Sequence, residues 1–182
     1  AAAVQAVKIA QRALFVQAGG TRSMQMSLEQ GLLDFTTADR TLLVPEIGEP
    51  RIVRAAAQRQ PDTRVHFVRS DGTVAMLVTD PAENLQCWLD IETTGAIEEV
   101  AVLPGAPGNI ESHVYYVVNR EVNGSTKRYL EKWATEAQNR GGSSNMMADS
   151  FITYEGTAAT VMTGLSHLEG RTVVAWGSTD AL

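Results

Sequence analysis

The sequence predicts a mainly-β protein with little helix, in which antiparallel hairpins form a β-propeller-like or β-sandwich domain. The prediction depends on short apolar runs that turn residues separate at even intervals, and on the turns Asp71-Gly72 and Asn123-Gly124. Asp-Gly and Asn-Gly between such runs are the strongest short-range signals of a hairpin. With 44% apolar and 20% charged residues, the 182-residue chain can bury a sizeable core.

The first half of the chain is expected to form two hairpins, each with a turn signal between two strand-like runs. Gly19-Gly20 tolerates the positive φ values that a tight turn requires. Asp71-Gly72 has the composition of a hairpin turn. The flanking strands are predicted over residues 11–18 and 21–28 for the first hairpin, and over 64–70 and 73–79 for the second.

Between these hairpins the sequence predicts one short helix. Residues 37–39 offer an N-cap, and apolar residues follow at helical spacing over residues 40–47. Pro45 limits this helix to about one turn, because proline cannot continue a helix. Single strands are expected over residues 51–59, 85–91 and 96–103, although the three alanines of the first run would also suit a helix.

A third hairpin is predicted around Asn123-Gly124, a pair that suits a type I′ turn. Its strands are expected over residues 112–118 and 125–134. The hairpins at Gly19, Asp71 and Asn123 recur at intervals of roughly 50 residues, which fits four-stranded propeller blades. The same spacing fits a β-sandwich, so the choice between the two architectures stays open.

The predicted domain organisation has three parts. Residues 1–139 form the antiparallel β domain, residues 140–149 form a Gly/Ser-rich linker or loop, and residues 150–182 form a small, incomplete β unit. Because the chain starts at Ala1 without a methionine, we expect it to be a piece of a longer parent protein. Strands of the last unit are predicted over residues 150–154, 158–162 and 171–176.

Histidine and cysteine patterns do not indicate a metal or catalytic centre. His66, His113 and His167 lie far apart in sequence and lack the spacing of paired metal ligands. The single cysteine, Cys87, cannot form an internal disulfide, and in a half-buried strand it is expected to be inert. His167 is interpreted as part of a turn, which Gly164 and Gly170 bracket.

Carboxylate pairs leave one alternative open. Glu98 and Glu99 are strand neighbours and should point to opposite faces. Asp90 and Glu92 can share a face, so a carboxylate-dependent hydrolase remains a weaker hypothesis. Residues 141–144 are Gly/Ser-rich but lack the lysine of a phosphate-binding loop. We therefore expect no catalytic residues, no cofactor and no metal.

Charge and hydropathy restrict the partners. The formal net charge of −6 does not favour tight binding to a phosphate backbone. No apolar run approaches the roughly 20 residues that a membrane span needs. Met146 and Met147 in a loop, and Trp176 at the end of a predicted strand, are candidate interface residues.

Several phrases of the sequence stand out together: RALFV at 12–16, DRTLL at 39–43, QPD at 60–62 leading to VRSDG at 68–72, GAIEEVAVLPG at 95–105, NREVNGSTKRYLE at 119–131 and GLSHLEGRTV at 164–173. In their order and spacing these phrases resemble one family, the tail nozzle or hub proteins (tail tubular or DNA-stabilisation type) of short-tailed bacteriophages. The chain covers only a middle portion of such proteins. It departs from their usual pattern at His66-Phe67 and at Ser166.

The resemblance implies a structural, non-enzymatic protein of the virion that is assembled in the host cytoplasm. It implies a β-propeller-like domain with neighbouring β domains, in a homo-oligomeric, hexameric ring around the DNA exit channel. Other tail proteins, such as an adaptor or portal-side ring and fibres, would be its partners, and DNA would pass without specific contacts. The alternative is a non-catalytic β module that binds a glycan or a receptor.

Overall fold

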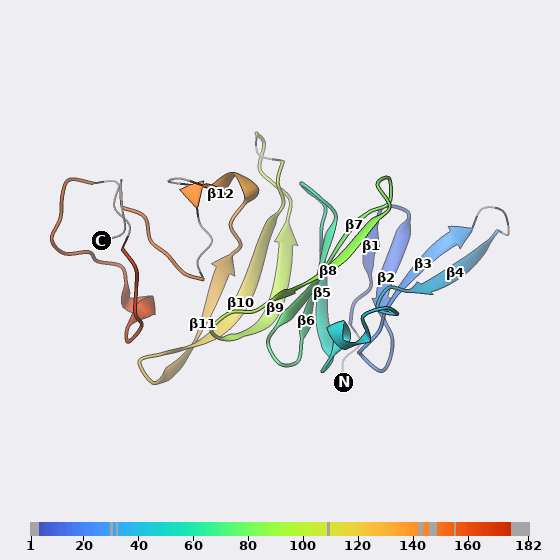
Figure 1. Ribbon diagram of the computed structural model, residues 1–182, viewed down its shortest axis with the longest axis horizontal. Coiled ribbons are helices and arrows are strands. Elements are labelled where there is room, and N and C mark those ends of the chain that lie inside the picture. The colour runs from blue at the N-terminus through green and yellow to red at the C-terminus, as the bar shows by residue number, and fades with distance from the viewer. Residues whose placement is uncertain are drawn as a thin grey trace.

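The computed structural model describes residues 4–29, 31, 33–108, 110–141, 144–145, 149–154 and 156–175. It confirms the mainly-β fold, because three antiparallel sheets of four, four and three strands make up most of the described secondary structure. Figure 1 shows these sheets side by side in chain order, with the C-terminal segment beyond the third sheet. Helical structure within the described residues is limited to short 3-10 turns.

The first sheet contains the predicted N-terminal hairpin and two strands that were not predicted. Its strands, in spatial order, are β1 (Val7–Ile9), β2 (Arg12–Val16), β3 (Ser23–Glu29) and β4 (Asp34–Asp39). The turn between β2 and β3 is wider than a two-residue turn, since the Gln17 N–H donates to the Arg22 carbonyl at 2.9 Å. Only Gly20 of the Gly19-Gly20 pair has positive φ, at 84°.

The predicted helix over residues 40–47 is wrong. Asp39 accepts hydrogen bonds from the Thr41 N–H at 2.8 Å and from its hydroxyl at 2.6 Å, which turns the chain directly after β4. Leu43 is exposed, so no helical apolar face forms. Proline then starts a short 3-10 helix, η1 (Pro45–Gly48), instead of continuing an α-helix.

The second sheet confirms the predicted strands on either side of Asp71-Gly72. Asp71 accepts from the Thr73 N–H at 3.0 Å, and Gly72 has a φ of 86°. The neighbouring strands at each edge were predicted as single strands and join the same sheet. In spatial order the strands are β5 (Ile52–Gln58), β6 (Arg64–Arg69), β7 (Val74–Asp80) and β8 (Leu85–Ile91).

The third sheet confirms the predicted hairpin at Asn123-Gly124. Val122 pairs with Ser125 across the turn, and both turn residues have positive φ, 48° and 71°, as a type I′ turn requires. β10 is longer than expected because this hairpin extends to the turn itself. In spatial order the strands are β11 (Ser125–Lys132), β10 (His113–Val122) and β9 (Ala96–Leu103).

Two apolar cores hold the three sheets in a stack. The first core lies between the first and second sheets and includes Leu14, Phe67 and Leu77. The second core lies between the second and third sheets and includes Val68 and Val118. The middle sheet is therefore covered on both faces, as in a propeller blade or the centre of a layered sandwich.

The sheets are also joined by hydrogen bonds of one repeated kind. The Ile52 N–H at the start of β5 donates to the Gly20 carbonyl at 2.8 Å, and the Ile97 N–H in β9 donates to the Gly72 carbonyl at 2.9 Å. In both cases a carbonyl in the turn between the second and third strands of one sheet accepts a hydrogen bond from the first strand of the next sheet. A Cβ at Gly72 would lie 2.6 Å from the Ala96 Cβ, so this approach requires glycine.

The C-terminal part differs from the prediction. Residues 150–154, 158–162 and 171–175 form no strand where the structure describes them, because they have no sheet to pair with and their apolar side chains are exposed. A 3-10 turn, η3 (Ser166–Leu168), lies between Gly164 and Gly170, which both have positive φ as turn residues. Met146, Met147 and Trp176 lie outside the described residues.

Part of the predicted linker, residues 140–149, belongs to a two-stranded sheet of β12 (Asn139–Gly141) and β13 (Ser144–Asn145). The 3-10 turn η2 (Glu136–Gln138) precedes this sheet. The described helical segments are all too short to cross a membrane.

Candidate functional site

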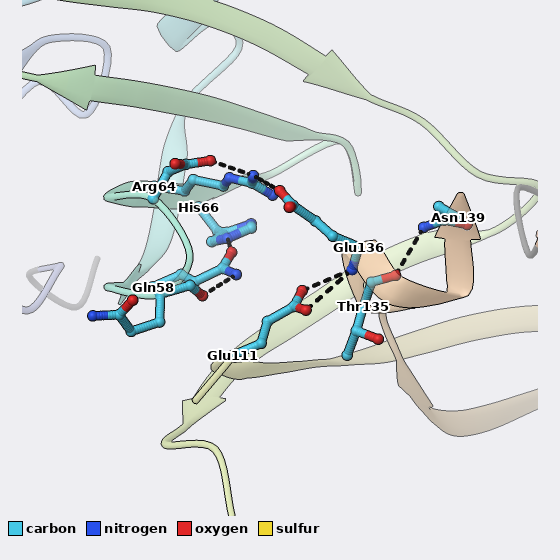
Figure 2. Close-up of polar contacts among 9 residues, drawn as sticks. Gln58, Arg64, His66, Glu111, Thr135, Glu136 and Asn139 are labelled. Atoms are coloured by element: carbon cyan, nitrogen blue, oxygen red, sulfur yellow. Dashed lines mark hydrogen bonds and ion pairs between the residues drawn. The ribbon is translucent and has the colours of Figure 1, made fainter. Parts of the chain in front are cut away.

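A network of polar side chains joins the second sheet to the third, and we call it the inter-sheet joint; Figure 2 shows part of it. It brings together residues from β5, β6 and β10 with the segments that precede β10 and follow β11. Its members are Gln58, Arg64, His66, Glu111, Tyr116, Trp133, Thr135, Glu136 and Asn139.

His66 is the centre of this joint and is completely buried. Its Nδ1 lies 2.7 Å from the Tyr116 hydroxyl, and its Nε2 lies 3.2 Å from Gln58 Oε1. Because Gln58 Nε2 donates to the Gln60 carbonyl at 2.9 Å, Gln58 Oε1 faces His66 as an acceptor. His66 therefore carries its proton on Nε2, and the Tyr116 hydroxyl donates to Nδ1.

The surroundings keep both partners uncharged. Burial, with a smaller effect from the Arg64 charge, lowers the pKa of His66 from 6.5 to about 4. Burial also raises the pKa of the Tyr116 hydroxyl. The Trp133 ring packs edge-on against His66, at 5.2 Å between centroids and 80° between planes. This arrangement suits a neutral hydrogen-bonded link between sheets, not a general base at neutral pH.

Charged side chains surround the buried centre (Figure 2). Arg64 Nη2 lies 2.7 Å from a carboxylate oxygen of Asp62 and 2.8 Å from one of Glu136, which ties β6 to η2. The Glu111 carboxylate accepts from the Glu136 N–H at 3.0 and 3.1 Å. These contacts at the surface thus connect the second sheet to the third sheet and its following segment, as the His66–Tyr116 hydrogen bond does in the interior.

A pocket of about 390 Å³ opens beside the joint. Its size is near the lower end of ligand sites, but such sites have mostly apolar walls and this wall is largely polar. Most of its polar groups already bond to one another, whereas Asn139 Oδ1 is buried without a partner among the described residues. The lining residues are Gln58, Arg64, Glu111, Ser112, Val114, Trp133, Ala134, Glu136 and Asn139.

Three of the four carboxylates considered from the sequence, Asp90, Glu98 and Glu99, lie in ion pairs with different arginines. Asp90 Oδ1 lies 2.7 Å from Nη2 of the nearly buried Arg69. Glu98 contacts Arg128 at 2.6 Å. Glu99 contacts Arg54 at 2.7 Å, so the two neighbouring glutamates have different partners.

The remaining candidate residues are dispersed. Of the three histidines, only His66 belongs to the joint; His113 starts β10 and His167 lies in η3. Cys87 is a free, partly buried thiol in β8. Within the described ranges, no three His, Cys, Asp or Glu side chains are grouped as metal ligands would be.

Sequence reasoning did not predict the joint. Strand alternation puts His66 and Phe67 on opposite faces of β6, but it gives the His66 face no partner. Tyr116 is distant in sequence, and no local pattern connects it to His66. Comparison with known proteins does not add a functional assignment, since neither a protein-family model nor a curated protein matches the chain.

Proposed function

We propose that this chain is a structural component of a phage tail nozzle or hub, which forms part of a homo-oligomeric ring around the DNA exit channel. The observation that carries the proposal is that the sheets stack face to face and leave apolar side chains exposed on both outer faces of the stack. Phe35 of the first sheet is 63% exposed and Leu130 of the third is 72% exposed. Clustered apolar side chains on a surface mark contact sites with other proteins.

The residues that carry the family resemblance support this reading. RALFV is β2, GAIEEVAVLPG contains β9, and NREVNGSTKRYLE is the β10–β11 hairpin. These three phrases thus coincide with strands and a turn that build the stack. A resemblance in framework residues supports a shared architecture and a role in assembly, and the hexameric state comes from the resemblance alone.

The use of charged residues supports a role without catalysis. Arg64, Arg69 and Arg120 each pair with carboxylates and join strands or sheets. The charged groups described above serve packing, so we propose that the chain is not an enzyme. Pairing of arginines with acids also suits a wall along which DNA passes, since free cations would bind phosphates tightly.

Electron microscopy of purified virions with antibodies against this chain tests the proposal. We expect label at the tail, between an adaptor or portal-side ring and the fibres, and ring-shaped density with a channel wide enough for a DNA duplex. Absence of the chain from virions, or a density without a channel, would refute the proposed function.

A further inference from the structure

The pocket beside the inter-sheet joint has walls from both of the sheets that the joint connects. Gln58 and Arg64 come from β5 and β6 of the second sheet, whereas Glu111 and Glu136 come from the segments next to the third sheet. Figure 2 shows these side chains around one space. The volume of about 390 Å³ lies within the range of small-molecule sites, so a ligand the size of one sugar ring can enter.

The buried part of the pocket wall is fixed before any ligand arrives. Gln58 is 3% exposed, and both ends of its amide are held: Nε2 donates to the Gln60 carbonyl at 2.9 Å, and Oε1 lies 3.2 Å from His66 Nε2. The N–H of the buried Ser112 donates to the same carbonyl of Gln60 at 3.1 Å. A ligand therefore meets a preformed surface and spends little of its binding free energy on ordering these groups.

The wall keeps hydrogen-bond donors and acceptors for a ligand. Within the described residues, Arg64 contacts Asp62 and Glu136 through Nη2 alone, which leaves its Nε and Nη1 as donors. Glu136 contacts Arg64 through Oε1, which leaves Oε2 as an acceptor. The Ser112 hydroxyl makes no hydrogen bond to another described residue, and a hydroxyl can both donate and accept. Such a mixed set matches a ligand whose own hydroxyls donate and accept.

The charges of the wall favour a neutral ligand. Arg64 is already paired with the carboxylates of Asp62 and Glu136, and Glu111 adds a further carboxylate to the wall. An anionic ligand would meet these carboxylates as like charges. Within the described ranges no three His, Cys, Asp or Glu side chains are grouped for a metal ion, and the largely polar wall does not suit an apolar ligand.

Trp133 adds an aromatic ring to this polar wall. The residue is only partly buried, and its ring lies 5.2 Å from the His66 ring and 6.0 Å from the Tyr116 ring, between centroids, so its orientation is fixed by the joint. A pyranose has C–H groups on the faces of its ring and hydroxyls around the edge. It can therefore place a face on the apolar surface of an aromatic side chain while its hydroxyls bond to polar groups.

We propose that this pocket binds one neutral hexopyranose unit of a carbohydrate, with the sugar ring beside Trp133 and its hydroxyls bonded to Arg64, Ser112 and Glu136. The binding is non-covalent, and no residue of the pocket is assigned a catalytic step. The site adds recognition of a glycan to the structural role proposed above. The inference does not rest on that role, because the pocket belongs to the joint between two sheets of a single chain.

Titration of the 182-residue chain with D-glucose, D-galactose and D-mannose, followed by saturation-transfer difference NMR, tests the proposal. At least one of these sugars should bind with a Kd on the order of 1 mM, as expected for a ligand of this size. D-Glucuronate should bind at least about tenfold more weakly, because its carboxylate would meet Glu111 and Glu136. A pocket that holds only water, with no binding of any of the three sugars about a hundredfold above that Kd, would overturn the proposal.

Substitutions show whether the sugar occupies this pocket. Ser112→Ala and Glu136→Ala should each raise the Kd by about fivefold or more, because each removes a hydrogen-bonding group. Glu99→Ala is the matched control: the Glu99 side chain is 46% exposed against 50% for Glu136, each is paired with an arginine, and Glu99 does not line the pocket. Circular dichroism checks that the variants fold. Unchanged affinity in both pocket variants, an equal loss in Glu99→Ala, or glucuronate binding as tight as that of the neutral sugars would each refute the site.

Discussion

Acid should weaken the fold through His66. Its pKa is about 4 in the folded protein, against 6.5 for an exposed histidine. Below pH 6.5 the unfolded chain takes up a proton at this position that the native protein does not accept until about pH 4. The free energy of unfolding therefore falls as the pH decreases through this window.

The size of the effect follows from the two pKa values. Each unit of difference corresponds to about 1.4 kcal/mol, and the window between pH 7.5 and 5 captures most of the proton uptake by the unfolded chain. His66 should thus reduce the free energy of unfolding by about 2 kcal/mol between these pH values. In the native structure the added charge would be held in the buried joint with Tyr116 and Gln58.

Urea unfolding at pH 7.5 and at pH 5 measures this effect as a difference between wild type and His66→Gln, which cannot titrate. Between pH 7.5 and pH 5, the free energy of unfolding should fall by about 2 kcal/mol less in the variant than in the wild type. Leu14→Ala is the control, because it destabilises the first core and removes no titratable group, so it should keep the pH dependence of the wild type. Equal pH dependence in wild type and His66→Gln would refute the reasoning.

The measurement stays above the range in which two carboxylates titrate. Burial tends to raise the pKa of Asp39 and Asp71, but hydrogen bonds from Thr41 and Thr73 lower it overall, below the ordinary value of 3.8. Their contribution to stability is present above that value and is lost as the pH falls through the lowered pKa. At pH 5 both carboxylates remain charged, so the difference reports His66.

Two further substitutions test the contacts between sheets by urea unfolding. Tyr116→Phe should cost about 1–3 kcal/mol, because it leaves the buried Nδ1 of His66 without a donor; an unchanged midpoint would contradict the assigned hydrogen bond. Gly72→Ala should cost more than Gly124→Ala, since both have positive φ but only the Cβ at residue 72 would clash, with Ala96; equal costs would show that this approach is not tight.

The central strands could be predicted because local chemistry determines them. β8 and β9 have the predicted bounds, Leu85–Ile91 and Ala96–Leu103, since turn residues flank both runs. β4 (Asp34–Asp39) was missed because almost every residue in it is exposed, so it shows no alternation of apolar and polar side chains. It is a strand because its backbone pairs with β3, which is a property of the neighbouring strand.

The joint could not be predicted from the sequence because its partners are distant. Alternation in β6 separates His66 from Phe67, but it does not say whether the second face meets solvent or another sheet. That depends on Tyr116 and Trp133, which the third sheet brings to it. The stacking of sheets is thus the part of the fold that local patterns leave undetermined.

The hydrogen bonds of the buried His66 help to fix the register of β6, a strand that is covered on both faces. β6 is apolar enough on each side that the hydrophobic pattern alone discriminates poorly between its two orientations. A slip of one residue would turn His66 toward the apolar side chains of the first core, such as Leu14 and Leu77, and away from Tyr116 and Gln58. Each unsatisfied group would cost about 1–3 kcal/mol. The bonds to Tyr116 and Gln58 therefore favour the observed register and fix which face of the middle sheet meets the third sheet.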